Sequence, residues 1–168
     1  MRSILKVNWD SNLPIYEISQ SELRKKGIHC LLLDVDGTLV NRNSTKVPKA
    51  VRNWISGSKK HFCLYLINNN QSKKRIPKIA KELNLRYKYN ASKPRKKVTL
   101  SAIKEIGRKP KNIAIIGDRI FTDIIVGNRC KIKTILVKRL KRDGLPIKFN
   151  LTLTIEKLIY NFIKWKLG

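Results

Sequence analysis

The chain has 168 residues, of which 42% are hydrophobic, and its 38 Lys and Arg against 11 Asp and Glu give a formal net charge of +27. This length and composition fit one folded domain with its own core and exclude a disordered chain. The sequence contains no run of about 18 apolar residues that would span a bilayer, and residues 1–10 lack the apolar stretch of a signal peptide, so we expect a protein that is not secreted.

Apolar stretches that are typical of buried parallel strands recur along the chain. In chain order they are 28–33, 62–67, 85–89, 112–116 and 133–137. Segments of helical period separate them, and this alternation indicates a parallel sheet that is covered on both faces. The sequence therefore predicts a single α/β domain over residues 1–168, built as a three-layer sandwich around a doubly wound, mostly parallel sheet of about five strands.

The expected helices are placed by their starts, stops and apolar faces. Ser21 and Gly27 bracket a short helix before the first strand, and Pro77 falls in the first turn of a helix that begins near Ser72 or Arg75. Two further helices each have one apolar face. Those faces consist of Val51, Trp54 and Ile55, and of Leu100, Ile103 and Ile106 before a stop at Gly107.

Polar residues follow the expected strands where these end. Asp34 and Asp36 follow the first strand, Asn68 follows the second, and Asp118 and Asp123 follow the fourth. Ligands bind beyond the carboxyl ends of parallel strands, so we expect these side chains to line one crevice. Four carboxylates so close together repel one another unless a cation lies among them, and Mg²⁺ is a cation that carboxylates, water and phosphate oxygens hold. The alternative is that these aspartates only cap helices and form turns.

Four short motifs occur in order along the chain: DVDGT at 34–38, INNN at 67–70, SKP at 92–94 and GDRIFTD at 117–123. With the lead-in IYEISQSELRKKGI, they resemble the haloacid dehalogenase (HAD) superfamily of aspartate-nucleophile phosphatases, and within it the YqeG-like branch of subfamily IIIA. The resemblance covers residues 14 to 145 and implies the Rossmann-like HAD fold. Two residues depart from the family pattern. Asn68 stands where relatives commonly have Ser or Thr, and Gly37 stands where the YqeG-like branch often has Asn.

The resemblance implies a chemical role for each matched residue. Asp34 is the nucleophile that takes up the phosphoryl group, and Asp36 is the general acid and base. Lys93 pairs with the nucleophile and with phosphoryl oxygens. Mg²⁺ is expected to bind Asp34, the backbone carbonyl of Asp36, and Asp118. Asp123 is also assigned to the metal site, where it acts from behind the direct ligands or through water.

Three further residues are expected to bind the substrate phosphate: Thr38, Asn68 and Asn69. A hydrogen bond within its own turn is an equally good role for Thr38, and an ordinary polar loop is the alternative for the two asparagines. The interval from Thr38 to Asn68 and the one from Asn70 to Lys93 each hold only a helix and a strand, so no cap domain is expected. A site without a cap admits a phosphate that is attached to a large body, such as a lipid in a bilayer.

The last segment, at about 151–167, is expected to form a basic amphipathic helix. Its apolar face consists of Ile155, Leu158, Ile159, Phe162 and Ile163, and Trp165 follows between two lysines. Such a helix fits a membrane interface, but a last helix that packs on the sheet has the same pattern. The expected location is therefore the cytoplasm, or the stroma or matrix of an organelle, with peripheral attachment to an anionic membrane surface as an alternative.

The net charge and the resemblance together favour a phosphorylated, anionic partner. The YqeG-like branch is similar to phosphatidylglycerophosphate phosphatases, which implies a phosphate on an anionic lipid as the substrate. Two alternatives remain: a phosphatase for a soluble or protein-bound phosphate monoester, and a basic RNA- or ribosome-associated protein. Non-specific binding of nucleic acid is expected at this charge, and no obligate protein partner is expected.

Overall fold

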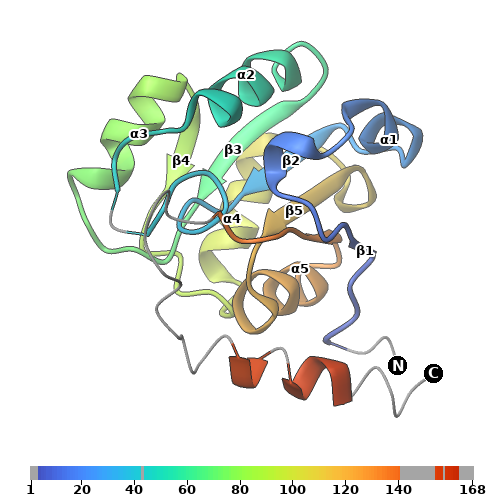
Figure 1. The fold of residues 1–168 in the computed structure, drawn as a ribbon. Coiled ribbons are helices and arrows are strands. Elements are labelled where there is room, and N and C mark those ends of the chain that lie inside the picture. Colours follow the sequence, from blue (N-terminus) through green and yellow to red (C-terminus); the bar gives the residue numbers. More distant parts are fainter. Residues whose placement is uncertain (1–3, 43, 141–153, 157, 163–168) are drawn as a thin grey trace.

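The computed structural model describes residues 4–42, 44–140, 154–156 and 158–162, and Figure 1 shows its fold. Six parallel strands form one sheet in the order β1-β6-β5-β2-β3-β4. The strands are β1 (Trp9–Asp10), β2 (Cys30–Leu33), β3 (Cys63–Ile67), β4 (Arg86–Lys88), β5 (Ile113–Gly117) and β6 (Lys133–Leu136). From β2 the chain runs outward through β3 to β4, returns to β5 beside β2, and continues outward to β6. This order confirms the predicted doubly wound α/β fold.

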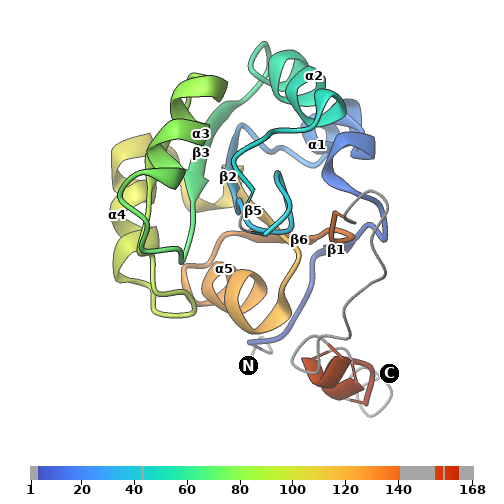
Figure 2. The same ribbon diagram turned by 60° about the vertical axis from the view of Figure 1, so that its left-hand side comes forward.

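Helices cover both faces of the sheet (Figures 1 and 2). They are α1 (Gln20–Lys25), α2 (Lys49–Ser58), α3 (Arg75–Leu83), α4 (Lys97–Ile106) and α5 (Ile125–Arg129), with 3-10 turns at Ile15–Glu17 and Pro110–Asn112 and a π-helical turn at Ile120–Ile124. Side chains of α1, α2 and α3 join the hydrophobic core on one face of the sheet, and those of α4 and α5 join the core on the other face. Residues 154–156 and 158–162 form the C-terminal helix.

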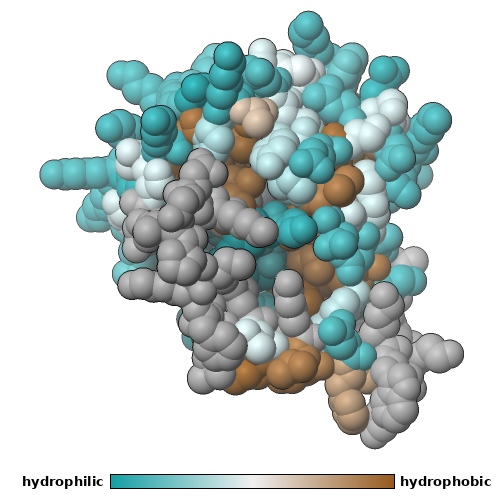
Figure 3. Space-filling model, in the orientation of Figure 1, coloured by the Kyte–Doolittle hydropathy of each residue, from teal (hydrophilic) through white to brown (hydrophobic). Residues whose placement is uncertain are grey.

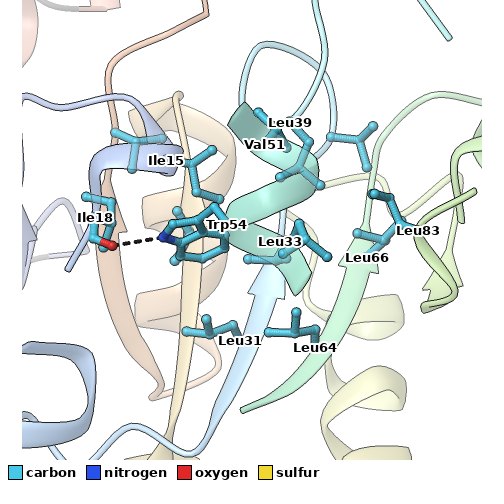
Figure 4. Close-up of a cluster of buried hydrophobic side chains, with 14 of the residues drawn as sticks. Ile15, Ile18, Leu31, Leu33, Leu39, Val51, Trp54, Leu64, Leu66 and Leu83 are labelled. Atoms are coloured by element: carbon cyan, nitrogen blue, oxygen red, sulfur yellow. Dashed lines mark hydrogen bonds between the residues drawn. The ribbon is translucent and has the colours of Figure 1, made fainter. Parts of the chain in front are cut away.

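Successive side chains of β2 point to opposite faces of the sheet and so contribute to both cores. Leu31 and Leu33 belong to the core beneath α2 and α3, whereas Leu32 belongs to the core beneath α4 and α5. Figure 4 shows Trp54 of α2 in the first core, where its indole N–H donates to the carbonyl oxygen of Ile18 at 2.8 Å. A buried indole needs such a partner, and this one ties α2 to the segment that precedes β2.

The starts of two helices follow from local hydrogen bonds. The expectation that Ser21 starts the first helix is wrong, because the Ser19 side chain accepts the N–H of Glu22 and α1 begins at Gln20. The alternative start at Arg75 is confirmed for α3. The hydroxyl of Ser72 accepts the N–H of Arg75 at 3.0 Å, so both residues that the sequence indicated take part in this start.

One other local expectation is wrong. Leu100 is exposed, because α4 buries the side of the helix that carries Thr99, Ala102 and Ile103. The sheet also has a sixth strand, β1, whose length of two residues is too short to give an apolar pattern. Between β2 and α4 the described residues form α2, β3, α3 and β4 and no further domain, which agrees with the expected lack of a cap.

The C-terminal helix lies beside α5 in both ribbon views (Figures 1 and 2). Its apolar residues are exposed, so this face of the helix does not pack on the sheet; they are Ile155, Leu158, Ile159 and Phe162. The predicted helix residues Ile163 and Trp165 lie outside the described residues. Within the described ranges, the model has no helix whose length and hydropathy would let it cross a membrane.

Candidate active site

Three neighbouring strands end at the same edge of the sheet, and a polar residue follows each of them. Asp34 follows β2, Asn68 follows β3, and Asp118 follows β5. The strands pair in parallel with their ends aligned, so these residues lie at one edge, as their order in the sequence predicts. Lys93 reaches the same edge from the loop between β4 and α4, and Asp123 from the π-helical turn.

A buried lysine lies between two buried carboxylates at this edge. Lys93 Nζ lies 2.7 Å from Asp34 Oδ1 and 2.6 Å from Asp123 Oδ1, and it also donates to the carbonyl oxygen of Ile67 at 3.2 Å. Burial by itself lowers the pKa of Lys93, but the carboxylates of Asp123 and Asp34 raise this pKa above its usual value. The lysine is therefore a fixed positive charge within the site.

The carboxylates carry more negative charge than this lysine offsets. Burial raises the pKa of Asp34 to about 8; Lys93 opposes the shift, and the carboxylates of Asp123 and Asp118 add to it. Burial and Asp123 also raise the pKa of Asp118 to about 6, against the effect of Arg139, whose Nε lies 2.6 Å from Asp118 Oδ2. The three aspartates each offer a carboxylate oxygen within 4.8 Å of the others. A divalent cation would supply the missing positive charge.

One carboxylate oxygen in this cluster has no hydrogen-bond partner. Asp118 Oδ1 is buried and accepts no hydrogen bond within the described part of the chain, while Oδ2 is held by Arg139. Buried polar atoms are usually paired, so an unpaired carboxylate oxygen beside two more carboxylates fits a hard cation that binds oxygen ligands. Asp34, Asp118 and Asp123 are the side chains that would hold it.

The side chain of Asp36 has a different pair of partners. Its Oδ1 accepts from Arg75 Nη2 at 2.6 Å, and its Oδ2 accepts from Asn68 Nδ2 at 2.8 Å. The Asp36 carboxylate therefore lies outside the cluster of three acids, and its backbone carbonyl remains the expected metal ligand. This arrangement leaves the carboxyl group to proton transfer, the role that the sequence predicts for it.

A family model matches a part of the chain that includes some of the site residues, and a known protein matches most of the chain. The HAD-hydrolase-like family model matches residues 90–144, which include Lys93, Asp118 and Asp123. The chain is also 28% identical over 153 residues to the probable phosphatase YqeG of Bacillus subtilis (strain 168), with 90% of this chain and 88% of that protein aligned. The chain is therefore similar to HAD-type hydrolases within residues 90–144 and to a probable phosphatase over most of its length.

Two further similarities concern a part of this chain and its fold. A segment of 54 residues is 37% identical to the mitochondrial phosphatidylglycerophosphatase GEP4 of Saccharomyces cerevisiae, and it covers 32% of this chain and 27% of that one. The crystal structure of the HAD family enzyme BT-2542 of Bacteroides thetaiotaomicron, in complex with magnesium and inorganic phosphate, superimposes with a TM-score of 0.50 and 14% identity over 70% of this chain and 98% of that chain. At this identity the structural match supports the fold alone.

The residues expected to bind substrate also hold other residues of the candidate site in place. The Thr38 hydroxyl donates to Asp34 Oδ2 at 3.3 Å. The Asn69 amide donates to the carbonyl oxygen of Lys93 at 2.9 Å and accepts the N–H of Lys93 at 2.7 Å. Asn68, as described above, holds the carboxylate of Asp36. Their contacts with substrate remain predictions.

Two glycines allow the close approach of charged groups in the candidate site. Gly37 has a φ of +90°, and a Cβ atom there would lie 2.6 Å from both Arg139 Nε and Asp118 Oδ2. At Gly117 a Cβ atom would overlap the carboxyl group of Asp123. Each position therefore requires glycine, the first for its backbone conformation as well as for space.

Two arginines that contact the acids of the candidate site were not predicted from the sequence. Arg75 is the first residue of α3, and Arg139 lies three residues beyond the end of β6. Charge gives no signal for either residue, because the chain has 38 Lys and Arg. Position gives a signal for Arg139, since residues that follow the neighbouring strands β5 and β2 also form the centre.

Proposed function

We propose that this HAD-type phosphatase is a Mg²⁺-dependent phosphomonoester hydrolase that forms an aspartyl-phosphate intermediate on Asp34. The observation that carries the proposal is the cluster of Asp34, Asp118 and Asp123 around the buried ammonium group of Lys93. The three carboxylates, with the backbone carbonyl of Asp36, would hold the Mg²⁺ ion. When bound, the ion supplies positive charge that lets an anionic phosphate approach an anionic carboxylate. The crystal structure of the HAD family enzyme BT-2542, which shares the fold, is a complex with magnesium and inorganic phosphate.

The first step of the proposed reaction transfers the phosphoryl group to Asp34. A carboxylate oxygen of Asp34 forms a bond to phosphorus, the bond from phosphorus to the ester oxygen breaks, and the carboxylic acid of Asp36 gives its proton to that oxygen. Lys93 keeps Asp34 in place, since its ammonium group lies 2.7 Å from the carboxylate, and it offers positive charge to the phosphoryl oxygens.

The second step releases inorganic phosphate. The Asp36 carboxylate takes a proton from water while the water oxygen forms a bond to phosphorus. The bond between phosphorus and Asp34 then breaks, which restores the Asp34 carboxylate. Arg75 and Asn68 each hold one oxygen of Asp36 and so orient this group for both proton transfers.

We propose phosphatidylglycerophosphate as the substrate, with phosphatidylglycerol and phosphate as products. The similarity of a 54-residue segment to a phosphatidylglycerophosphatase supports this substrate class. The similarity to the probable phosphatase YqeG over most of the chain supports phosphatase activity without naming a substrate. The described residues include no domain that would cover the site, and an open site admits a phosphate that is attached to a lipid in a bilayer.

We also propose that the enzyme works at an anionic membrane surface. Its net charge of +27 attracts it to such a surface. Figure 3 has exposed apolar side chains at the lower edge of the view, where the C-terminal helix lies in Figure 1. Apolar side chains next to a basic surface are typical of proteins that bind in the interface of anionic membranes.

The test is phosphate release from phosphatidylglycerophosphate, presented both in neutral detergent micelles and in anionic vesicles, with Mg²⁺ or with a chelator. Asp34→Asn serves as the inactive control. We expect Mg²⁺-dependent release, faster on vesicles, and none above the control in chelator. A panel of soluble phosphate monoesters runs in parallel, and a preference for those esters over the lipid would replace the lipid substrate with a soluble one. Failure on every ester would refute the phosphatase itself.

A further inference from the structure

The C-terminal helix turns a polar side inward and an apolar side outward. Glu156 is only 2% exposed, whereas Ile155 is 44% and Leu158 is 63% exposed. Burying a carboxylate costs free energy unless hydrogen bonds or opposite charges compensate it. This orientation of the helix therefore depends on specific partners for Glu156.

Both partners of Glu156 belong to the chain segment between Asp118 and Asp123, which are two of the proposed metal ligands. The backbone N–H of Phe121 donates to Glu156 Oε1, and Arg119 Nε lies 3.5 Å from Glu156 Oε2. The N–H of Phe121 belongs to the first turn of the π-helical segment, and N–H groups there have no partner within their own helix. Glu156 supplies that partner from 35 residues away in the sequence.

The capped segment in turn orients Asp123. The backbone N–H of Arg119 donates to Asp123 Oδ2 at 3.2 Å, and the carbonyl oxygen of Arg119 accepts the N–H of Asp123 at 3.0 Å. The other carboxylate oxygen of Asp123 contacts Lys93 at 2.6 Å. Asp118 directly precedes Arg119 in the chain, so a shift of Arg119 moves two of the three clustered carboxylates.

We propose that Glu156 is a positioning residue of the metal centre, which holds Arg119 and Phe121 so that Asp118 and Asp123 stay at metal-binding separation. The inference rests on the proposed Mg²⁺ site and makes the C-terminal helix a part of it. The apolar side of the same helix is the one that we assign to the lipid surface. Contact with lipid and order of the metal-binding turn are thus linked through one side chain.

The experiment compares the full-length protein with Glu156→Ala, Glu156→Gln and the matched control Glu82→Ala. Glu82 also pairs with an arginine, Arg52, at 3.4 Å, but on the exposed surface. The readouts are hydrogen exchange of the Phe121 amide in metal-free protein and the Mg²⁺ dissociation constant from calorimetry, and neither requires turnover. For Glu156→Ala we expect faster exchange and Mg²⁺ binding weakened by about 10- to 100-fold. For Glu82→Ala we expect the behaviour of the wild type.

Glu156→Gln separates the hydrogen bond from the charge. Its amide oxygen still accepts the N–H of Phe121, so we expect slow exchange and a smaller loss of Mg²⁺ affinity. The inference would be overturned if the Phe121 amide exchanged equally fast in both Glu156 variants. It would also be overturned if Glu156→Ala kept the wild-type exchange rate and the wild-type Mg²⁺ dissociation constant. A wild-type protein that binds no Mg²⁺ would instead contradict the proposed function, so the two failures are distinguishable.

Discussion

The two ends of the parallel sheet present opposite kinds of surface. At the carboxyl end, three aspartates crowd around one lysine. At the amino end, an open cavity of about 1030 Å³ has no carboxylate among its lining residues. Its charged lining residues and histidines are Arg24, Lys25, His29, Lys59, His61 and Arg108. Both ends are charged, but within the described residues only the carboxyl end brings together the groups that we propose to attack phosphorus, transfer protons and hold a cation.

The cations of the amino end have a structural role that needs no ligand. Helices α1, α2 and α4 end there, and helix ends expose carbonyl oxygens that cations satisfy. The same is true of α3, because Lys59 Nζ donates to the carbonyl oxygen of Leu83, the last residue of α3. In a chain with 38 Lys and Arg, a basic cavity is therefore weak evidence for a site, whereas a convergence of the few acids is strong evidence.

Removing the nucleophile should have the largest effect on activity. Asp34→Asn keeps the shape of the side chain but offers a poor nucleophile, so we expect phosphate release to fall at least about a thousandfold. Circular dichroism would check that the variant is folded. Turnover within tenfold of wild type would place the nucleophile elsewhere.

Removing the buried lysine should affect stability as well as turnover. Lys93→Ala leaves the Asp34 and Asp123 carboxylates without their shared partner, and breaking a buried ion pair costs about 3–5 kcal/mol of unfolding free energy. Urea unfolding without metal would measure this loss, and Mg²⁺ should recover part of it. Lys96→Ala, an exposed neighbour, is the control; an equal effect of the two substitutions would contradict the account.

Loss of the arginine beside the general acid and base should have an intermediate effect. Arg75→Ala removes the contact of 2.6 Å that orients Asp36, and general acid–base catalysis contributes about 100-fold or more. We expect kcat to fall by part of that contribution, about tenfold, with KM little changed and with partial recovery in Arg75→Lys. The exposed Arg95→Ala is the control, and an unchanged kcat in Arg75→Ala would show that Asp36 needs no such support.

The amino-end cavity should show the smallest effect. Arg24 and Arg108 line this cavity, at the end of the sheet opposite the three aspartates. The double variant Arg24→Ala and Arg108→Ala should therefore not change the turnover of a soluble ester. Non-specific binding to single-stranded RNA should show a shallower salt dependence, by about 0.7 in the log–log slope for each phosphate that the variant no longer neutralises. A marked loss of turnover would assign chemistry to the cavity and break the contrast between the two ends.

The sequence predicted the features that depend on local pattern. Apolar runs placed five strands, and the acids that follow β2 and β5 indicated the carboxyl-end cluster before any contact was known. Lys93 was selected from a crowd of cations by the SKP motif. These predictions worked because strand ends in a parallel sheet bring distant residues to one edge.

The remaining features depend on contacts between distant segments. Arg75, Arg139 and Glu156 each meet a partner between 21 and 39 residues away, and neither arginine differs in local pattern from the other cations of the chain. Glu156 lies off the apolar face of the expected C-terminal helix, and the sequence pattern does not reveal which side of that helix faces the domain. The expectation that Leu100 lies on the buried face of its helix was wrong for the same reason.

The measurement that tests the central claim most directly is chemical trapping of the intermediate. Protein that is turning over phosphatidylglycerophosphate with Mg²⁺ would be quenched and treated with borohydride, which reduces an acyl phosphate to an alcohol and so converts a phosphorylated aspartate to homoserine. Peptide mass spectrometry would then locate the homoserine. The account predicts it at position 34, only when substrate and Mg²⁺ are both present; homoserine at another aspartate, or turnover with none at all, would contradict it.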